Sequence, residues 1–366
     1  MSSWTDKKGF PVLIRSVDDP NELKIYENKG WEIPIFYKKE NESDEIHVKL
    51  MTGDTLKIDQ DQPVILNPNR YGFYRIIDTT PKPFLTNKVE KLKHLSDLFA
   101  AFELGRVDIS VYLNFVKVQI LDASDGDNLE TSNIVLTELL DHLSMLSTIF
   151  ASNNISKMVA KSYSNIENLL KVDSNIRSRM TALVALSYGI EESSLEKLNL
   201  DSKMPKLICS IKQESSQESS QENFYQKYDQ ADATEKQLIG QAICKAETNS
   251  EKCLTWINSD SVADCDKPYY LTTLAAQNST TRDYIWNFLV ENQEKMNEKY
   301  KNGIFLLPRL YKGVLELFNE SRIVEEFCGD HKLEKARQAI NQGFDSVLLN
   351  ERIFESNRGI FEGYEF

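Results

Sequence analysis

Residues 67–83 read NPNRYGFYRIIDTTPKP, and the chain changes character within this stretch. Residues 67–69 are turn formers, and residues 72–77 form a short apolar and aromatic run typical of a strand. Two prolines within residues 79–83 mark a linker. The sequence therefore predicts β-structure over residues 1–80 and helices over residues 81–366.

The β-character is clearest over residues 46–50, where apolar Val48 and Leu50 alternate with polar residues. Alternation with a period of two predicts a half-buried strand. Residues 31–35 repeat this pattern. Because Pro34 has no N–H group to donate to a neighbouring strand, we expect its strand to lie at the edge of a sheet.

Downstream of the linker, apolar residues recur every three or four positions, which is the period of amphipathic helices. Gly105 follows the first of these sets, where a helix C-cap favours a residue that tolerates positive φ. Pro308 is acceptable in the first turn of another helix. Many such helices joined by short loops predict antiparallel pairs stacked in a repeat-like array. The clearest sets are Leu92, Leu95, Phe99 and Phe102; Val135, Leu139, Leu143, Leu146 and Phe150; and Leu307, Leu310, Tyr311, Val314 and Phe318.

The overall composition excludes several classes of protein. A formal net charge of -13 argues against nucleic acid as the main partner, and we interpret the cluster Lys88, Lys91 and Lys93 as the solvated face of a helix. No apolar run approaches the roughly 20 residues of a membrane-spanning helix. The segment 213–222 reads QESSQESSQE, which predicts a surface loop.

The sequence offers no recognisable catalytic, cofactor-binding or metal-binding residues. The four histidines are isolated, and no HExxH pair is present to hold zinc on one helix face. A Gly-rich phosphate loop and a GxSxG nucleophile elbow are absent as well. The histidines are His47, His94, His142 and His331.

Cysteines and sequons allow, but do not require, an extracellular protein. The five cysteines contain no CxxC pair, and their odd number leaves at least one free thiol in a monomer. Composition and spacing do not select a pairing. Candidate glycosylation sites of the form Asn-x-Ser/Thr begin at Asn41, Asn154, Asn278 and Asn319.

Several motifs in the first part of the chain resemble zinc aminopeptidases of the aminopeptidase N and puromycin-sensitive aminopeptidase family. The opening WTDKKGFPVL resembles the segment with which these enzymes leave their catalytic domain. A tryptophan and isoleucine-proline-isoleucine strand follows, and then a signature that runs from an asparagine to GYYR. The matching residues are Trp4, Gly9, Pro11, Trp31, Pro34, Asn67, Gly72, Tyr74 and Arg75.

Two later motifs extend the resemblance over nearly the whole chain. HLSDLFAAFELG resembles the first helix of the family's C-terminal helical domain, and RDYIWNFLVENQEKMNEKYKNGIFLLPRL resembles its last large motif. The matching residues here include Asp97, Phe99, Arg282, Trp286, Phe288 and Arg309. Reasoning from residue chemistry, we expect Tyr74 and Arg75 to tie the strands to the helices, and Trp286 and Phe288 to pack in the core.

The resemblance implies a mostly α fold in which a small N-terminal β-sandwich precedes a large HEAT-like, bowl-shaped α-superhelix. Zinc and the catalytic residues belong to an upstream domain of such enzymes, so this chain alone is expected to be non-catalytic. It would form the wall and cap of the peptide cavity. Its expected partners are the catalytic domain of the same protein, a peptide and a second copy of the chain.

Departures from the family pattern keep an alternative open. Lys91, Lys93 and His94 stand where the family often has an arginine, and the family's glutamate-tyrosine-tryptophan segment is not recognisable in residues 116–130. The alternative is a free-standing, inactive module that binds a peptide or protein. A third hypothesis is a helical-repeat scaffold unrelated to peptidases.

The resemblance also bears on the cellular compartment. Cys209 and Cys244 fall at the positions of a disulfide of the extracellular branch, which implies an extracellular protein or a membrane-anchored ectodomain. A second bridge of that branch has no counterpart near Ser187 and Tyr188. A cytoplasmic location therefore remains the alternative.

Overall fold

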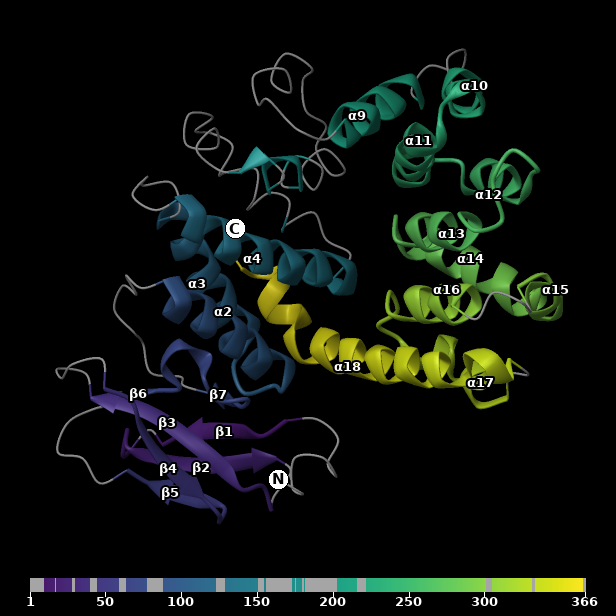
Figure 1. Cartoon of the computed structure of the whole chain (residues 1–366). Coiled ribbons are helices and arrows are strands. Elements are labelled where there is room, and N and C mark those ends of the chain that lie inside the picture. The colour runs from purple at the N-terminus through teal and green to yellow at the C-terminus, as the bar shows by residue number, and fades with distance from the viewer. Residues whose placement is uncertain are drawn as a thin grey trace. The chain divides into compact units, whose positions relative to one another are not determined.

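The structure is a computed structural model of the chain, shown in Figure 1. It divides into two compact units, of which the first comprises residues 1–122 and 130–139 and the second comprises residues 123–129 and 140–366. The described residues are 10–16, 18–27, 30–39, 45–58, 64–77, 88–122, 129–150, 155, 173–174, 176–179, 181, 203–215, 222–300, 305–330 and 333–364.

Among the described residues of the first unit, seven strands form two sheets. One sheet has the order β5-β2-β1-β7 and the other the order β4-β3-β6. Neighbouring strands are antiparallel except β1 and β7, which are parallel. The strands are β1 Val12–Arg15, β2 Glu22–Glu27, β3 Ile33–Lys39, β4 His47–Met51, β5 Thr55–Lys57, β6 Val64–Leu66 and β7 Arg75–Ile77.

The two sheets share one apolar core, which confirms the predicted β-sandwich. Leu13 and Leu23 enter this core from the four-stranded sheet, and Ile33 and Ile35 enter it from the three-stranded sheet; all four are fully buried. Their alternation with exposed or half-buried neighbours is what a strand with one solvated face requires.

The prediction that the strand of Pro34 lies at a sheet edge is wrong, because β3 is the central strand of its sheet. β4 pairs with the whole of Ile33–Tyr37, but β6 pairs only with Tyr37–Lys39. Pro34 therefore lies in the part of β3 that has a neighbouring strand on one side only. A proline is tolerated there because no ladder hydrogen bond from its nitrogen is needed on the open side.

The strand predicted over residues 46–50 is present, but its apolar side chains do not face the core. Val48 is 57% exposed and Leu50 is 55% exposed, whereas Met51 is fully buried. In the antiparallel register, Val48 lies opposite Phe36 and Leu50 lies opposite Pro34. Since directly opposed residues share one face, the outer face of the three-stranded sheet is apolar.

Helices α2 and α3 complete the first unit together with the first part of α4. Phe99 and Phe102 of α2 pack against Tyr112 of α3, with ring centroids 5.1 and 6.2 Å from the tyrosine ring. Gly105 ends α2 with a φ of +67°, as the sequence predicts. The helices span Lys88–Glu103 in α2, Ile109–Asp122 in α3 and Leu129–Phe150 in α4, and the buried stripe predicted for α4 is confirmed.

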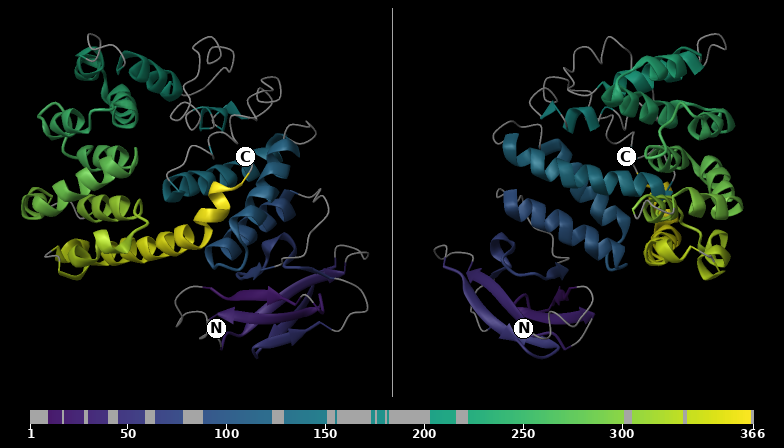
Figure 2. Two further views of the ribbon diagram at one scale, coloured as in Figure 1. Left: turned by 180° about the vertical axis from the view of Figure 1, so that it is seen from behind. Right: turned by 45° about the vertical axis from the view of Figure 1, so that its right-hand side comes forward.

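The second unit is built from helices that pack mainly on near neighbours in the sequence. Contacts link α9 to α11, α11 to α13, α13 to α16 and α16 to α18, so these helices form a row, and α10, α12 and α14 pack beside it (Figure 2). The helices are α9 Met204–Ser215, α10 Glu222–Gln230, α11 Ala233–Ala246, α12 Ser250–Asn258, α13 Lys267–Ala275, α14 Ser279–Glu291, α15 Gln293–Lys299, α16 Leu306–Leu315, α17 Glu325–Asp330 and α18 Arg337–Glu362, with 3₁₀ turns at η3 Ser321–Ile323 and η4 Glu334–Ala336.

This row agrees with the predicted helical domain, so the mostly helical fold class is confirmed. The HEAT-like bowl and a domain boundary at residue 80 stay predictions. The loop predicted over residues 213–222 is shorter than expected, because α9 extends to Ser215 and α10 begins at Glu222. Residues 216–221 lie outside the described part of the chain.

The C-terminal helix of the second unit returns to the end of α4. The Phe361 ring stacks on the Phe150 ring with 4.2 Å between the ring centroids. The centroid of the Phe354 ring lies 5.9 Å from that of Phe150. Among the described helices, none combines the length and the apolar character that crossing a membrane requires.

Two helical glycines form a matched pair for a stability test. A Cβ atom on Gly240 in α11 would overlap the ring of Tyr270, whereas a Cβ on Gly359 in α18 would meet no atom within 4 Å. We expect Gly240→Ala to lower the free energy of unfolding by about 1–3 kcal/mol through overpacking. Gly359→Ala should raise it by about 0.5–1 kcal/mol through helix propensity. Urea unfolding followed by circular dichroism measures both, and a Gly240→Ala protein as stable as the wild type would contradict the packing.

Candidate functional site

The signature segment begins with a loop that Asn67 closes on itself. The Asn67 Nδ2 group donates to the carbonyl oxygen of Gly72 at 3.1 Å, and the Gly72 N–H donates to Asn67 Oδ1 at 2.7 Å. Between them lies the 3₁₀ turn η1, Pro68–Arg70, which Asn67 enters with a φ of 48°. Asparagine tolerates this left-handed conformation better than most residues, which explains its place here.

This loop positions Tyr74 in the sandwich core, next to β3. The Tyr74 hydroxyl accepts a hydrogen bond from the backbone N–H of Phe36 at 3.0 Å, directly before the residues of β3 that pair with β6. Burial raises the pKa of Tyr74 well above its ordinary value, so the hydroxyl stays neutral. Gly72 is required because a Cβ atom would overlap the Tyr74 ring. The hydrogen bond of Tyr74 thus lies within the sandwich, and the Asp97 carboxylate of α2 is near enough to add to the rise of its pKa. That Tyr74 ties the strands to the helices stays a prediction.

Arg75 makes the predicted connection from the strands to α2. Its Nη1 donates to the hydroxyl of Ser96, and it lies 3.4 Å from Asp97 Oδ1. Arg70 Nη2 approaches the same Ser96 hydroxyl at 3.5 Å. Since charge-assisted hydrogen bonds are stronger than neutral ones, this cluster fastens the first helix to the sandwich.

The expectation that the lysine cluster on α2 is solvated is wrong for Lys93, which is buried. Its side chain is only 7% exposed and forms an ion pair with Glu90 at 2.8 Å. Its Nζ also donates to the carbonyl oxygen of Leu66 at 2.7 Å. A buried ammonium group needs such partners to offset its lost hydration. Lys93 is therefore a second polar tie between α2 and the sandwich.

Asp97 is the titratable centre of this cluster. Burial raises its pKa to about 6, although Arg75, Lys93 and Arg70 each act to lower it. The carboxyl group is therefore mostly ionised at neutral pH but takes up a proton under mildly acidic conditions.

Two further signature residues of the first unit, Pro11 and Trp31, contribute to the packing and hydrogen bonding of the sandwich. The carbonyl oxygen of Pro11 accepts from the backbone N–H of Arg75 at 3.0 Å, and Trp31 is buried in the sandwich core. Trp4 and Gly9 lie outside the described residues, as do the sequons at Asn41 and Asn154.

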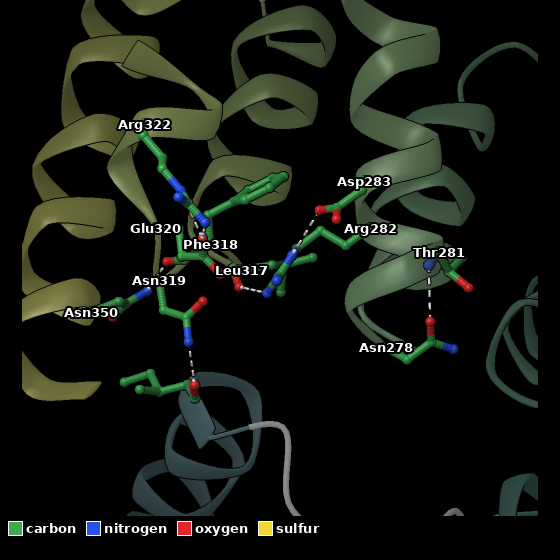
Figure 3. A network of polar contacts seen from close by, with 11 residues as sticks. Asn278, Thr281, Arg282, Asp283, Leu317, Phe318, Asn319, Glu320, Arg322 and Asn350 are labelled. Atoms are coloured by element: carbon green, nitrogen blue, oxygen red, sulfur yellow. Dashed lines mark hydrogen bonds and ion pairs between the residues drawn. The ribbon is translucent and has the colours of Figure 1, made fainter. Parts of the chain in front are cut away.

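Arg282 in α14 anchors the signature of the second unit (Figure 3). Only 7% of this residue is exposed. Its Nη1 donates to the carbonyl oxygen of Leu317 at 2.6 Å, and its guanidinium carbon lies 4.6 Å from the centroid of the Phe318 ring. Burial lowers the pKa of Arg282, and the neighbouring Asp283 carboxylate at 3.8 Å opposes that effect. The arginine thus joins α14 to the segment after α16.

Aromatic packing surrounds this anchor. Trp286 is buried as predicted, with its ring centroid 5.0 Å from that of Phe327 and 5.7 Å from that of Phe318. Phe288 is half-buried and packs against the same core. Arg309 has a different environment: it is exposed, and its guanidinium carbon lies 4.3 Å over the ring of Tyr269.

The two sequons in the described part of the chain differ sharply. Asn278 is exposed and caps α14, with its Oδ1 accepting from the backbone N–H of Thr281 at 2.9 Å (Figure 3). Asn319 is buried, and its Nδ2 donates to the carbonyl oxygen of Ile149 at 2.7 Å. Because a glycan attaches to the amide nitrogen, the structure leaves room for one at Asn278 and none at Asn319.

All five cysteines lie in the described residues, and the structure joins none of them to another by a disulfide. Cys209 and Cys244 both lie in the core of the second unit, but the sulfur found beside Cys244 is that of Cys253, at 3.9 Å. The pairing of Cys209 with Cys244 stays a prediction.

Within the described residues, no three His, Cys, Asp or Glu side chains lie together as a metal site would require. His47 stacks on Tyr37 and His94 packs against the edge of Phe115, while His331 lies outside the described part. The described residues therefore offer no ligand set that fits a zinc ion. That the chain has no metal or cofactor of its own stays a prediction.

The surface feature that the sequence did not reveal is the outer sheet face, which we define as Pro34, Phe36, Val48, Leu50 and Tyr71. The ring of Tyr71, which is 59% exposed, lies 6.2 Å from that of Phe36. An exposed apolar group of this kind is typical of a surface that contacts another protein domain. The alternating pattern showed that a strand was present but not which face was covered.

Comparison with known proteins agrees with the motifs. A family model described as ERAP1-like C-terminal domain matches residues 63–349. Aminopeptidase M1 of Arabidopsis thaliana is 21% identical over an alignment of length 430. The alignment covers 97% of this chain and 47% of the plant protein. The chain thus spans about half the length of this curated relative.

The raised pKa of Asp97 predicts the sign of a pH effect. Because the folded-state pKa of about 6 exceeds the usual value of 3.8, the carboxyl group stabilises the fold most below the usual value, and this stabilisation is lost as the pH rises through 6. Relative to Asp97→Asn, the wild type should therefore lose about 1 kcal/mol of unfolding free energy between about pH 5 and about pH 7.5. Urea unfolding at the two pH values measures this change.

Asp108 provides the control for that experiment. The hydrogen bond from the Ser110 hydroxyl lowers the pKa of Asp108 most, and the hydrogen bonds that it accepts from the backbone N–H groups of Val111 and Ser110 lower it further. Asp108 is therefore ionised in both states over this range, and the stability difference between the wild type and Asp108→Asn should not change with pH. If the difference in unfolding free energy between the wild type and Asp97→Asn is the same at both pH values, burial does not raise the pKa of the Asp97 carboxyl group.

The sequon geometry gives a second prediction. When the chain is produced through a secretory pathway, the folded protein should carry a glycan at Asn278 and none at Asn319. Mass spectrometry of tryptic glycopeptides measures the occupancy of each site. Substantial occupancy at Asn319 in correctly folded protein would be incompatible with its buried amide.

Proposed function

This chain belongs to the family of ERAP1-like C-terminal domains, and we propose on that basis that it is the non-catalytic C-terminal part of a zinc aminopeptidase. In this proposal a preceding domain of the same protein holds the zinc ion and cleaves the peptide bond. The present chain forms the wall and cap of the peptide cavity and supplies domain contacts.

The outer sheet face is the observation that carries this proposal. Val48 and Leu50 are more than half exposed although they sit side by side with Phe36 and Pro34 on one sheet face. Covering such side chains would remove apolar surface from water, which stabilises a complex by about 25 cal/mol per Å². We propose that the preceding zinc domain covers this face.

The signature segment supports the same assignment. Phe73 is 73% exposed, whereas the adjacent Tyr74 is buried. The Phe73 ring meets the partly exposed Phe10 ring edge to face at 6.4 Å. Tyr74 therefore packs within the sandwich, while the preceding Phe73 is exposed and can contact a neighbouring domain.

A free-standing module that binds a peptide or protein is the second candidate. Phe305 is 81% exposed and caps α16 four residues before Arg309, whose Nη1 donates to the Tyr269 hydroxyl at 3.1 Å. An exposed aromatic residue one helical turn before an exposed arginine suits an extended peptide that carries a carboxylate. A second copy of the chain is a further possible partner for either surface.

We also propose an extracellular or ectodomain location, with a cytoplasmic location as the alternative. The exposed sequon at Asn278 is compatible with secretion, because its amide nitrogen is available while its oxygen caps the helix.

The proposal is tested by reconstitution with the zinc domain encoded upstream in the same gene. We expect this chain alone to bind no stoichiometric zinc and to leave aminoacyl anilides intact, and to associate with the separately produced zinc domain. If the gene encodes no such domain, or if the isolated chain binds zinc and turns over substrate, the proposal is wrong.

Matched variants locate the contact. Leu50→Lys places a charge on the outer sheet face, and we expect it to weaken association about tenfold or more, because burying an unpaired charge is costly. Leu348→Lys in α18 alters a residue of similar exposure, 45%, and should leave the affinity unchanged. Calorimetry measures both affinities, and circular dichroism verifies folding. Equal affinities would show that the outer sheet face is not the contact.

A further inference from the structure

Two thiols face each other across the turn between α11 and α12. Cys244 lies in the last turn of α11 and Cys253 in the first turn of α12. Their sulfur atoms are 3.9 Å apart, and both residues are fully buried. Nothing in the resemblance to aminopeptidases pairs these two positions.

The backbone around the two thiols is held in place without any bond between the sulfurs. Gln277 Nε2 donates to the carbonyl oxygens of Cys244 at 2.6 Å and of Glu247 at 2.9 Å. Glu247 Oε1 in turn accepts from the backbone N–H of Asn249 at 2.9 Å. These contacts fix the end of α11 and the turn that follows it.

The start of α12 is fixed equally well. Asn249 caps the helix, with Oδ1 accepting from the backbone N–H of Lys252 at 2.9 Å, and its carbonyl oxygen accepts from the N–H of Cys253 at 3.1 Å. A disulfide needs a separation of about 2.05 Å between the sulfurs. Because the backbone already holds the residues together, side-chain rotation can supply the remaining approach of about 2 Å.

We propose that Cys244 and Cys253 are a redox modification site, at which an intrachain disulfide forms by exchange with a low-molecular-weight disulfide such as glutathione disulfide. One cysteine thiolate attacks glutathione disulfide, which forms a mixed disulfide and releases one glutathione. The second cysteine attacks the mixed disulfide, which closes the protein disulfide and releases a second glutathione. The two cysteine sulfurs give up two electrons, and both thiol protons end on the two glutathione molecules.

Burial sets the kinetics of this exchange. The thiolate is the reacting form, and burial raises the pKa of the Cys244 thiol, so reaction in the folded protein waits for a local opening of the turn. A reducing agent meets the same barrier in the oxidised protein. The bond should therefore form readily during folding in a redox buffer and slowly in the folded chain.

The competing pairing joins Cys244 to Cys209 in α9, a helix that packs against α11. The segment between Cys244 and Cys253 is the shorter of the two loops, so its closure costs less chain entropy. The two pairings share Cys244 and exclude each other, which makes them distinguishable in one experiment.

Peptide mapping of the full chain distinguishes these outcomes. The chain is refolded in a buffer of reduced and oxidised glutathione, its free thiols are alkylated, and it is digested with trypsin without reduction. Cleavage after lysine and arginine places Cys209 in residues 207–212, Cys244 in residues 237–245, and Cys253 with Cys265 in residues 253–282. Cys265→Ser removes the exposed thiol from the last fragment and makes the assignment unique.

We expect fragment 237–245 to be linked to fragment 253–282 in the Cys265→Ser protein, and the link to persist when Cys209→Ser is added. The oxidised protein should melt about 5 °C higher than the reduced protein, and a thiol reductant should abolish the difference. In Cys253→Ser this particular link should be absent.

Two results would overturn the proposal. One is a link between fragments 237–245 and 207–212 in the Cys265→Ser protein. The other is recovery of both Cys244 and Cys253 in alkylated form after refolding in the redox buffer. Circular dichroism of the Cys265→Ser protein confirms that mapping was done on folded material, so neither result can be attributed to misfolding.

Discussion

The reciprocal pair of hydrogen bonds between Asn67 and Gly72 is the constraint on which the first unit depends. It closes a loop that contains three residues of positive φ, at Asn67, Asn69 and Arg70, and such backbone is unfavourable unless its surroundings hold it. The loop places the Tyr74 hydroxyl at the backbone N–H of Phe36 in β3 and places Arg75 against α2. A single turn therefore completes the sheet hydrogen bonding and attaches the first helix.

Much of this architecture could be predicted from periodicity alone. The apolar stripe of α4 and the end of α2 at Gly105 follow from residue spacing and from the freedom of glycine, which are local properties. The edge position inferred for Pro34 fails because a strand can be central in its sheet and still lack a neighbour along part of its length. The exposure of Val48 and Leu50 was not predictable, because alternation defines two faces without stating which one is covered.

Some features of the candidate sites could likewise be predicted from the sequence, and others could not. The contact from Arg75 to α2 was predicted from side-chain chemistry and holds, whereas the burial of Lys93 was missed because three nearby lysines suggested a solvated face. The Glu90 carboxylate three residues before Lys93 was the available signal. Buried Asn319 looks like any other sequon in the sequence. The proximity of Cys253 to Cys244 depends on how α11 and α12 pack, and no local pattern contains that information.

The return of α18 to α4 has a consequence for biosynthesis. Asn319 and Ile149, which share a hydrogen bond, are 170 residues apart, and Phe361 stacks on Phe150 from still further along the chain. On the ribosome, the end of α4 emerges long before the groups that will cover it have been translated. The nascent polypeptide therefore presents the Phe150 ring to solvent and to chaperones until α18 has been translated. Premature termination within the last turns of α18 would leave that ring without its stacking partner.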